Sequence, residues 1–533
     1  MYFRNFPAPL ALALGLALTS IARAEPSLPP LALPDPMPAP PLTVLLPVPD
    51  ARIEAAVATL DDLGQEMLER SGIPGLAIAV VHHGKTVYAR GFGLRAVGQP
   101  EPVDADTVFL LASLSKSVGA TVVAAEVSAG TVSWDSPVRD FLPWFTLGDP
   151  WIDSHVTIGD LYAHRSGLPD HAGDDLEDIG YDRRAVLDRL ALLPQHPFRA
   201  HYAYTNFGLT AAAEAVAVAA GTDWANLSDQ MLYTPLGMSS TSSRHADYMA
   251  RPNRAASHVR DGDLFAVSDQ RQPDAQSPAG GVSSSVNDMA RWMALVLATG
   301  ELGDQQLITT EALIPAISPQ AIDGLPMSPA ARPSLYGYGF GVGTRASGRV
   351  VISHSGAFAL GASTTYMLIP DLDLGIVVLT NALPTGAAEA IAASFADRAE
   401  LGVDSRDWFA GYAPRMAALS APLGSLVGVS PPANPAPAKP DSAYVGAYLN
   451  PYFGPIRVER DDHGLVLRLG PQEHRLEMTH WNGDSFIVQT VTENQPAGSI
   501  SRLDFQTDTD GKPLQVTIEH LNDYGLGAFR AAE

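Results

Sequence analysis

The sequence of 533 residues contains no cysteine. This absence excludes disulfides, thiolate nucleophiles, cysteine-ligated zinc, iron–sulfur clusters and lipid anchors attached through cysteine. Positive charge is also scarce, because 34 Lys and Arg residues stand against 58 Asp and Glu and leave a formal charge of −24. Proteins that neutralise nucleic-acid phosphates or anionic lipids need clustered positive charge. We therefore expect no nucleic-acid partner and no peripheral binding to an anionic membrane.

Long apolar runs are missing as well. The apolar residues 10–18 follow Arg4 and precede the Ala-Arg-Ala sequence at 22–24. A short positive region, an apolar stretch too short to cross a bilayer and small residues at positions −3 and −1 predict a signal peptide over residues 1–24. An uncleaved membrane anchor is the alternative. Because no later segment approaches 18 uninterrupted apolar residues, we expect a periplasmic or secreted protein without stable membrane insertion after cleavage.

Proline is concentrated in two stretches that divide the chain. Ten prolines fall within residues 26–49, and a second cluster spans 431–437. Proline fixes φ and lacks an amide donor, which favours extended linkers. The division predicts a tether at 25–50, a large domain at 51–425, a linker at 426–440 and a last, smaller domain at 441–533.

The periodicity of apolar residues predicts an α+β domain followed by a small all-β module. Strands at both ends of the first domain, with helices between them, predict a sheet that is completed by its terminal segments. Short strands separated by Gly, Asn and Asp are typical of an antiparallel barrel. The expected helices are 51–70, 113–127, 184–193, 209–220, 287–297 and 386–401, and the expected strands are 75–81, 86–92, 339–342, 350–354, 363–369, 374–380, 456–459, 465–469, 486–490, 501–506 and 514–520.

Ser113 and Lys116 form the strongest local signal. Lysine occurs only four times in the chain, and this one lies in an otherwise apolar helical stretch. Residues three apart share a helix face, so the amine is expected beside the hydroxyl. A desolvated amine has a lowered pKa and can take a proton from serine, and the helix start favours an oxyanion. An N-cap serine with a lysine that extends to solvent is the structural alternative.

Two weaker patterns supply further candidates. Tyr204 and Asn206 precede an apolar helix; a tyrosine held near a lysine can ionise below its usual pKa of about 10, and the amide could bind a substrate carbonyl. His354, at the end of an expected strand, would be a cationic or hydrogen-bonding group facing the nucleophile. Gly356 would let substrate lie close to the strand, and the Ala357 amide could be an oxyanion donor. In isolation each pattern is equally compatible with a packing role.

Together, the patterns Ser113-x-x-Lys116, Tyr204-x-Asn206 and His354-x-Gly356 resemble the three active-site elements of the serine β-lactamase and DD-peptidase superfamily. The chain looks like the class C β-lactamase branch, with its DD-carboxypeptidases, D-aminopeptidases and esterases. The stretches 161–169, 278–282, 336–339 and 376–381 add to the likeness, which covers about residues 61–401. The segment from Tyr444 resembles the lipocalin-like barrel of some members.

The resemblance implies a β-lactamase-like fold, with an antiparallel sheet flanked by helices and an all-helical subdomain, and a serine hydrolase that works through an acyl-enzyme. Ser113, Lys116, Tyr204 and His354 would be catalytic, and Asn206, Gly356 and Ala357 would bind substrate. The expected substrates are short, non-ribosomal or D-residue-containing peptides, with linearised microcystin-type peptides as one example. Small acyl esters, β-lactams and a non-catalytic penicillin-binding-like sensor are the alternatives. His354 replaces the lysine of the β-lactamases proper, and residues 199–200 replace their usual Pro-Gly, which disfavours efficient β-lactam hydrolysis.

No cofactor or metal is expected, because metalloprotease, dinucleotide and nucleotide-binding motifs are absent. His82 and His83 are interpreted as a solvated hairpin turn without a third ligand nearby. His164, His171 and the acidic residues 174–178 could line a pocket, although a solvated acidic loop is the default for such a run. The expected partner is a small peptide or ester substrate, and the sequence leaves the oligomeric state open.

Overall fold

The computed structural model describes residues 46–532. The expected signal peptide and most of the expected tether lie outside the described residues. From Val48 onward the chain forms one compact unit. Within residues 46–532, none of the helices combines the length and the apolar composition that crossing a membrane requires.

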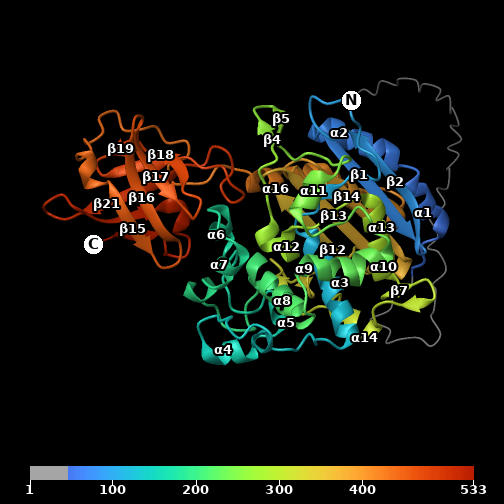
Figure 1. The fold of residues 1–533 in the computed structure, drawn as a ribbon. Helices are drawn as coiled ribbons and strands as arrows, with labels where there is room; N and C mark the ends of the chain where they lie inside the picture. Colours follow the sequence, from blue (N-terminus) through green and yellow to red (C-terminus); the bar gives the residue numbers. More distant parts are fainter. Residues whose placement is uncertain (1–45, 533) are drawn as a thin grey trace, which may run out of the picture. The chain divides into compact units, whose positions relative to one another are not determined.

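The first part of the unit is organised around an eight-stranded sheet in which all neighbouring strands are antiparallel (Figure 1). Its first strands pair with its last, since Leu76 lies opposite Thr380. This confirms the predicted sheet completed by terminal segments. The strand order is β2 (Lys85–Gly93), β1 (Gly75–His82), β14 (Leu374–Thr380), β13 (Ala362–Ile369), β12 (Val350–Phe358), β11 (Gly341–Thr344), β10 (Ser334–Tyr336) and β9 (Ala321–Gly324).

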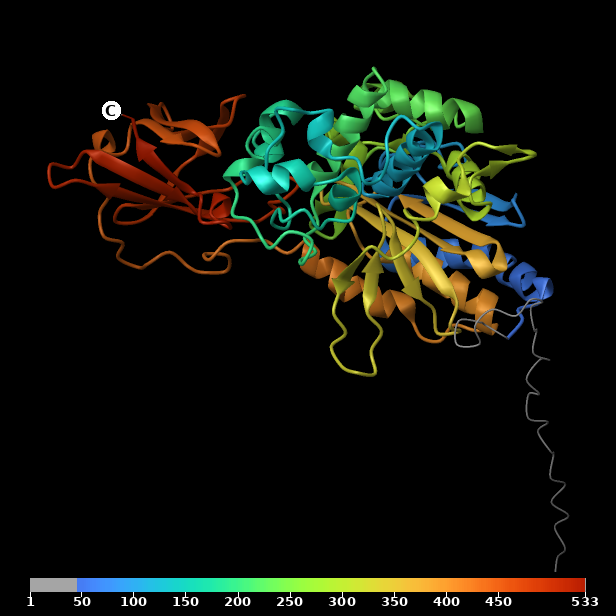
Figure 2. The ribbon, with the colours of Figure 1, turned by 90° about the horizontal axis from the view of Figure 1, so that it is seen from below.

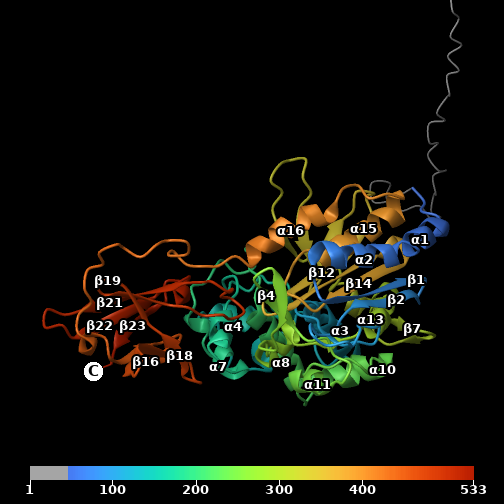
Figure 3. The same cartoon turned by 90° about the horizontal axis from the view of Figure 1, so that it is seen from above.

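Helices cover both faces of this sheet (Figure 3). On one face lie α1 (Asp50–Val57), α2 (Leu60–Ser71), α15 (Ala387–Leu401) and α16 (Trp408–Leu419). The single helix expected over 51–70 is two helices, because the Thr59 hydroxyl donates to the Ala56 carbonyl at 2.7 Å and competes with the helical hydrogen bonds there. The structure also contains α16, which includes Pro414 and was not predicted from the sequence.

The opposite face carries the predominantly helical region. Its central helix, α3 (Leu114–Ala129), is buried along most of its length, as its continuous apolar sequence predicts. The helix expected over 184–193 is shorter, because a 3₁₀ turn replaces its second half. The remaining helices are α4 (Pro150–His155), α5 (Ile158–Tyr162), α6 (Asp174–Asp178), α7 (Arg183–Leu187), α8 (Asn206–Ala219), α9 (Trp224–Ser228), α10 (Thr234–Leu236), α11 (His245–Ala250), α12 (Ser277–Gly280), α13 (Val286–Leu297) and α14 (Thr310–Leu313).

Three two-stranded ribbons complete this part of the molecule. One of them joins the segment before Ser113 to the segment after α12. The ribbons pair β3 (Phe109–Leu110) with β6 (Ser283–Ser284), β4 (His258–Asp261) with β5 (Leu264–Val267), and β7 (Glu301–Leu302) with β8 (Gln305–Gln306).

The C-terminal strands form a nearly closed nine-stranded antiparallel barrel, drawn in orange and red in Figure 2. Its interior is rich in aromatic side chains such as Tyr444, Phe486 and Phe505. The five predicted strands are confirmed, and four more were missed. In sheet order the strands are β18 (His474–Glu477), β17 (Gly464–Leu469), β16 (Gly454–Asp461), β15 (Gly446–Asn450), β23 (Ala528–Ala531), β22 (Pro513–Ile518), β21 (Ser501–Thr507), β20 (Ser485–Val488) and β19 (Thr479–Asn482).

Candidate active site

Ser113 lies at the start of α3, where the chain leaves the β3–β6 ribbon. The preceding residue, Ala112, is buried and has a φ of 48°, a conformation that is costly for a residue with a Cβ and recurs at functional sites. Ser113 itself is partly exposed. Among the described residues, no acceptor for its backbone N–H is recorded. The turn therefore presents both the hydroxyl and a free amide at the helix start.

Lys116 lies one helical turn further on and is completely buried. Its Nζ is 2.7 Å from Asn206 Oδ1, 2.9 Å from the Ala279 carbonyl and 3.1 Å from Ser113 Oγ. A neutral amine has two N–H donors and one lone pair. The two obligate acceptors, Asn206 Oδ1 and the Ala279 oxygen, take the two donors, which leaves the lone pair for the Ser113 hydroxyl. This arrangement suits a base that removes the serine proton.

The surroundings of Lys116 also favour the neutral amine. Its pKa is lowered to about 7, mainly by burial; the Asp174 carboxylate partly opposes this shift and the Arg271 guanidinium adds to it. About half of the molecules would then hold a neutral Lys116 near neutral pH. The structural alternative, a lysine that extends to solvent, does not describe this side chain.

Tyr204 donates a hydrogen bond to Ser113 Oγ at 2.8 Å, and the Lys116 amine lies 4.6 Å from the centre of its ring. The sequence led us to expect a phenol that ionises easily. Instead, burial raises the pKa of Tyr204, and its hydrogen bond with Ser113 offsets only part of this effect. Tyr204 therefore stays protonated in the free protein, and Lys116 is the better base.

Asn206 begins α8 and holds the amine of Lys116 in place. Its Nδ2 donates to Asp174 Oδ2 at 2.9 Å, and His171 Nδ1 contacts the same carboxylate oxygen at 2.9 Å. Asp174 is 4% exposed, and the pKa of His171 is raised to about 9, mainly by this carboxylate. The solvated acidic loop expected at 174–178 is therefore wrong for Asp174, which is part of the site.

His354 lies within β12 and not at its end, because the strand continues to Phe358. Its Nε2 is 2.9 Å from the Tyr336 hydroxyl, and its Nδ1 is 2.8 Å from the Ser355 carbonyl oxygen. A carbonyl can only accept, so Nδ1 carries the proton and Nε2 accepts from Tyr336. Burial lowers the pKa of His354, and the neighbouring Lys116 lowers it further. The imidazole is thus neutral at pH 7.

Gly356 brings β12 against the nucleophile. A Cβ at this position would lie 2.9 Å from the Ser113 backbone nitrogen and 2.6 Å from the Leu111 oxygen. Only glycine allows this approach, which places Ala357 beside the helix start. The His164 ring, which the sequence analysis considered as a pocket residue, lies 4.6 Å from that of Tyr204 and 5.1 Å from that of Tyr336, a residue that we did not select. These rings form an aromatic wall beside Ser113. His164 and Tyr336 belong to stretches that carried the family likeness.

His82 and His83 have a neighbour that the sequence did not reveal. The structure brings Asp50, at the start of α1, close enough that one donor atom from each of the three residues lies within 4.8 Å of the others. His82 is buried, whereas His83 and Asp50 are exposed. The expectation of no third ligand nearby is therefore wrong.

Comparison with known proteins agrees with this geometry. The β-lactamase family model matches residues 60–400, and a domain of unknown function, DUF3471, matches residues 430–526. The chain belongs to the β-lactamase family. It is therefore a serine hydrolase of the β-lactamase fold, whose relatives include peptidases, esterases and β-lactamases.

Individual relatives match different shares of the chain. The unguisins hydrolase ungD of Aspergillus violaceofuscus is 26% identical over 85% of this chain and 86% of its own length. The D-alanyl-D-alanine-carboxypeptidase/endopeptidase AmpH of Escherichia coli is 25% identical over 46% of this chain and 63% of its own. The octameric penicillin-binding protein homologue of Pyrococcus abyssi shares the fold, with a TM-score of 0.57 at 19% identity over 87% of this chain and 98% of its own.

Proposed function

We propose that this protein is an exported peptidase that cleaves amide bonds in short peptides through an acyl-enzyme on Ser113. The observation that carries the proposal is the set of three oxygens around Lys116 Nζ: Asn206 Oδ1 and the Ala279 oxygen can only accept, so a neutral amine has its lone pair left for Ser113 Oγ. The relatives named as a carboxypeptidase/endopeptidase and as an unguisins hydrolase support a peptide or a related amide as substrate.

Acylation begins when Lys116 takes the proton of Ser113 and Oγ attacks the substrate carbonyl carbon. The carbonyl π electrons move to the oxygen, and the Ser113 and Ala357 amides hold the resulting oxyanion. The C–N bond then breaks. Tyr204 donates its proton to the leaving nitrogen and regains one from the protonated Lys116, both of which contact Oγ, so that the amine departs neutral, Lys116 is again a neutral base and the ester remains on Ser113.

Deacylation repeats these steps with water. Lys116 takes a proton from the water, the hydroxide attacks the ester carbonyl, and the Ser113 oxygen leaves and regains a proton from Lys116. His354 has both ring nitrogens engaged, by Tyr336 and by the Ser355 carbonyl. We therefore assign it to the positioning of the aromatic wall and leave the proton transfer to Tyr204 and Lys116.

The test combines labelling with turnover. A fluorophosphonate should label Ser113 in the purified protein, as read by mass spectrometry of the tryptic peptide, and Ser113→Ala should abolish both labelling and turnover. Labelling of a different residue, or full turnover by Ser113→Ala, would refute the nucleophile. Matched amide and ester substrates then decide between a peptidase and an esterase of small acyl esters through their kcat/KM values. Acylation without turnover would instead identify a sensor.

A further inference from the structure

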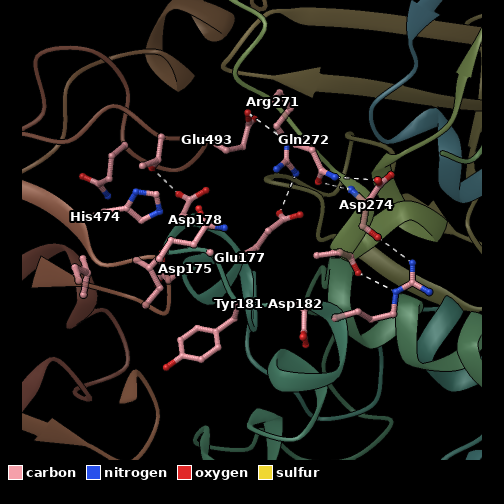
Figure 4. Close-up of a pocket in the computed structure, with 18 of the residues that line it drawn as sticks. Asp175, Glu177, Asp178, Tyr181, Asp182, Arg271, Gln272, Asp274, His474 and Glu493 are labelled. Atoms are coloured by element: carbon pink, nitrogen blue, oxygen red, sulfur yellow. Dashed lines mark hydrogen bonds and ion pairs between the residues drawn. The ribbon is translucent and has the colours of Figure 1, made fainter. Parts of the chain in front are cut away.

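A cavity of about 1340 Å³ lies between the barrel and the helical region, away from Ser113. Helices α6 and α7, the segment 270–275 and the barrel segment 489–495 line it. Figure 4 shows Arg271 in this cavity with its guanidinium directed between the carboxyl groups of Glu177 and Glu493. The barrel thus contributes a charged side chain to a buried cluster on the hydrolase part.

Glu493 reaches past Arg271 to the end of β12. One carboxyl oxygen, Oε1, accepts from the Ala359 backbone N–H at 2.7 Å, and Oε2 accepts from the Leu360 N–H at 3.3 Å. These amides follow directly after Phe358, the last residue of β12. A single barrel side chain therefore caps the strand that carries Ala357, two residues before the first of these hydrogen bonds.

Arg271 holds the same strand end from a second direction. Its side chain is only 6% exposed, its Nη2 lies 2.9 Å from Glu177 Oε2, and its guanidinium stacks 4.5 Å from the centre of the Phe358 ring. Phe358 in turn packs on Gly280, where a Cβ would lie 3.3 Å from its ring. The residue before Gly280 is Ala279, whose carbonyl accepts from Lys116. Phe358 thus links the barrel contact to both sides of the site.

We propose that Glu493 is a positioning residue of the active site, which fixes the end of β12 and thereby the Ala357 amide. The inference rests on the proposed function, because it requires Ala357 to be an oxyanion donor. Such a donor acts only when it lies 2.7–3.1 Å from the developing charge. β13 pairs with this strand as far as Phe358, and the two hydrogen bonds to Glu493 with the stacked Arg271 fix the turn that follows it, which β13 does not hold.

Other contacts hold the barrel without touching β12, and they provide the controls. Asp178 accepts from Thr492 Oγ1 at 2.6 Å, and from the backbone N–H and the side-chain amide of Asn494 at 3.0 Å each. Thr492→Val removes one of these three donors and leaves Glu493 in place. It therefore reports what a weakened barrel contact does by itself.

The experiment compares Glu493→Ala, Glu493→Gln and Thr492→Val in the full-length protein. Glu493→Ala should lower kcat by about 10–100-fold and change KM by less than about 3-fold, because oxyanion donors act in the transition state. Glu493→Gln should keep most of the activity. The amide preserves the shape of the carboxyl and keeps one acceptor oxygen for the backbone N–H groups of Ala359 and Leu360. Thr492→Val should keep wild-type kcat.

The controls separate the possible failures. If Glu493→Ala melts at a lower temperature but keeps wild-type kcat, Glu493 only docks the barrel and the inference is wrong. If Glu493→Ala does not fold, Glu493→Asp, which withdraws the carboxyl by one methylene, decides the question through its kcat at an unchanged melting temperature. Failure of the proposed function is recognised separately, since a fluorophosphonate would then not label Ser113 in the wild-type protein.

Discussion

Two buried cations lie close enough to influence each other, and their partners differ. Lys116 has the neutral oxygens of Asn206 and Ala279, whereas Arg271 has the carboxyl groups of Glu177 and Glu493. Burial lowers the pKa of Lys116 to about 7, because no carboxylate contacts its amine directly to offset the loss of solvation. The carboxylates raise the pKa of Arg271 although burial alone would lower it. The partners, and not the depth of burial, decide which cation can give up its proton.

The residue types fit these two environments. A lysine amine shifts its pKa readily when buried and can serve as a base, whereas a guanidinium keeps its charge and offers a planar set of donors. Arg271 uses that set on Glu177 and Glu493, and its planar group lies over the Phe358 ring. Lys116, beside Ser113, can thus become neutral, whereas Arg271, at the contact with the barrel, cannot.

The largest effect is expected when Lys116 is replaced by an arginine, which keeps its positive charge throughout the accessible pH range. Lys116→Arg should lower kcat/KM on the order of 10³-fold, because a guanidinium has no lone pair to accept the Ser113 proton. The rate of fluorophosphonate labelling of Ser113 should fall in parallel. Lys116→Ala is the matched control and should lose a similar factor. Near-wild-type labelling of Lys116→Arg would show that the base lies elsewhere.

Replacing Arg271, which keeps its charge, should lower the stability of the protein. Arg271→Met leaves Glu177 and Glu493 buried without a counter-charge, which costs about 3–5 kcal/mol of unfolding free energy. Both carboxyls already have raised pKa values, and without Arg271 these rise further. When the pKa of a carboxyl is higher in the folded than in the unfolded state, the folded protein loses stability as the pH rises from the unfolded pKa to the folded pKa. The loss should therefore be greater at pH 8 than at pH 6.

Urea unfolding at the two pH values measures this difference. The double variant Glu177→Gln with Arg271→Met is the control, because it removes one of the stranded charges and should recover part of the loss. An Arg271→Met protein as stable as the wild type at both pH values would mean that water reaches the cluster and screens its charges.

The sequence predicted the contacts of the site between residues close together in the chain, and few of those between residues far apart in it. Ser113 and Lys116 are one helical turn apart, so their contact followed from spacing. Tyr204 and His354 could be selected because their order matched a family pattern. The role of Asp174 was missed, since a run of acidic residues is usually solvated and only the packing of α6 against α8 buries it.

Contacts of the barrel and shifts in pKa also depend on residues that are distant in the sequence, so they could not be predicted from it. Glu493 carries no motif, and its contact with Ala359 spans 134 positions along the chain. The direction of the Tyr204 pKa was predicted wrongly because proximity to a lysine was the only cue, whereas burial dominates in the folded protein. Short strands such as β18 and β19 were missed because each has a single apolar or aromatic residue among three polar ones, which gives no alternation to recognise.

A smaller effect is expected when Lys116 is given the kind of partner that Arg271 has. Asn206→Asp places a carboxyl at the oxygen that now lies 2.7 Å from Lys116 Nζ. An opposite charge at this distance raises the pKa of an amine by about 1–3 units. Because only the neutral amine acts as a base, the rise of kcat/KM with pH should move upward by that amount from its wild-type midpoint of about 7. Activity lost at pH 7 should return at higher pH.

The pH profile distinguishes this effect from a simple loss of structure. Asp174 and the cationic His171 adjoin the new carboxyl, and any proton shared with Asp174 would reduce the shift without reversing its sign. Asn206→Ala provides the comparison, since it removes the acceptor without adding charge and should not move the profile upward. An unmoved profile for Asn206→Asp would contradict a catalytic role for neutral Lys116.

The smallest effect should come from a neutral contact between the barrel and the hydrolase part. The Tyr181 hydroxyl donates to the Phe453 carbonyl at 2.9 Å. Tyr181→Phe removes this hydrogen bond but keeps the ring against Arg189, whose guanidinium lies 4.5 Å from its centre. One neutral hydrogen bond contributes about 1 kcal/mol, so urea unfolding should show a loss of that size and kcat should not change. A loss as large as that of Arg271→Met would mean that the barrel is held by its hydrogen bonds as strongly as by its buried charges.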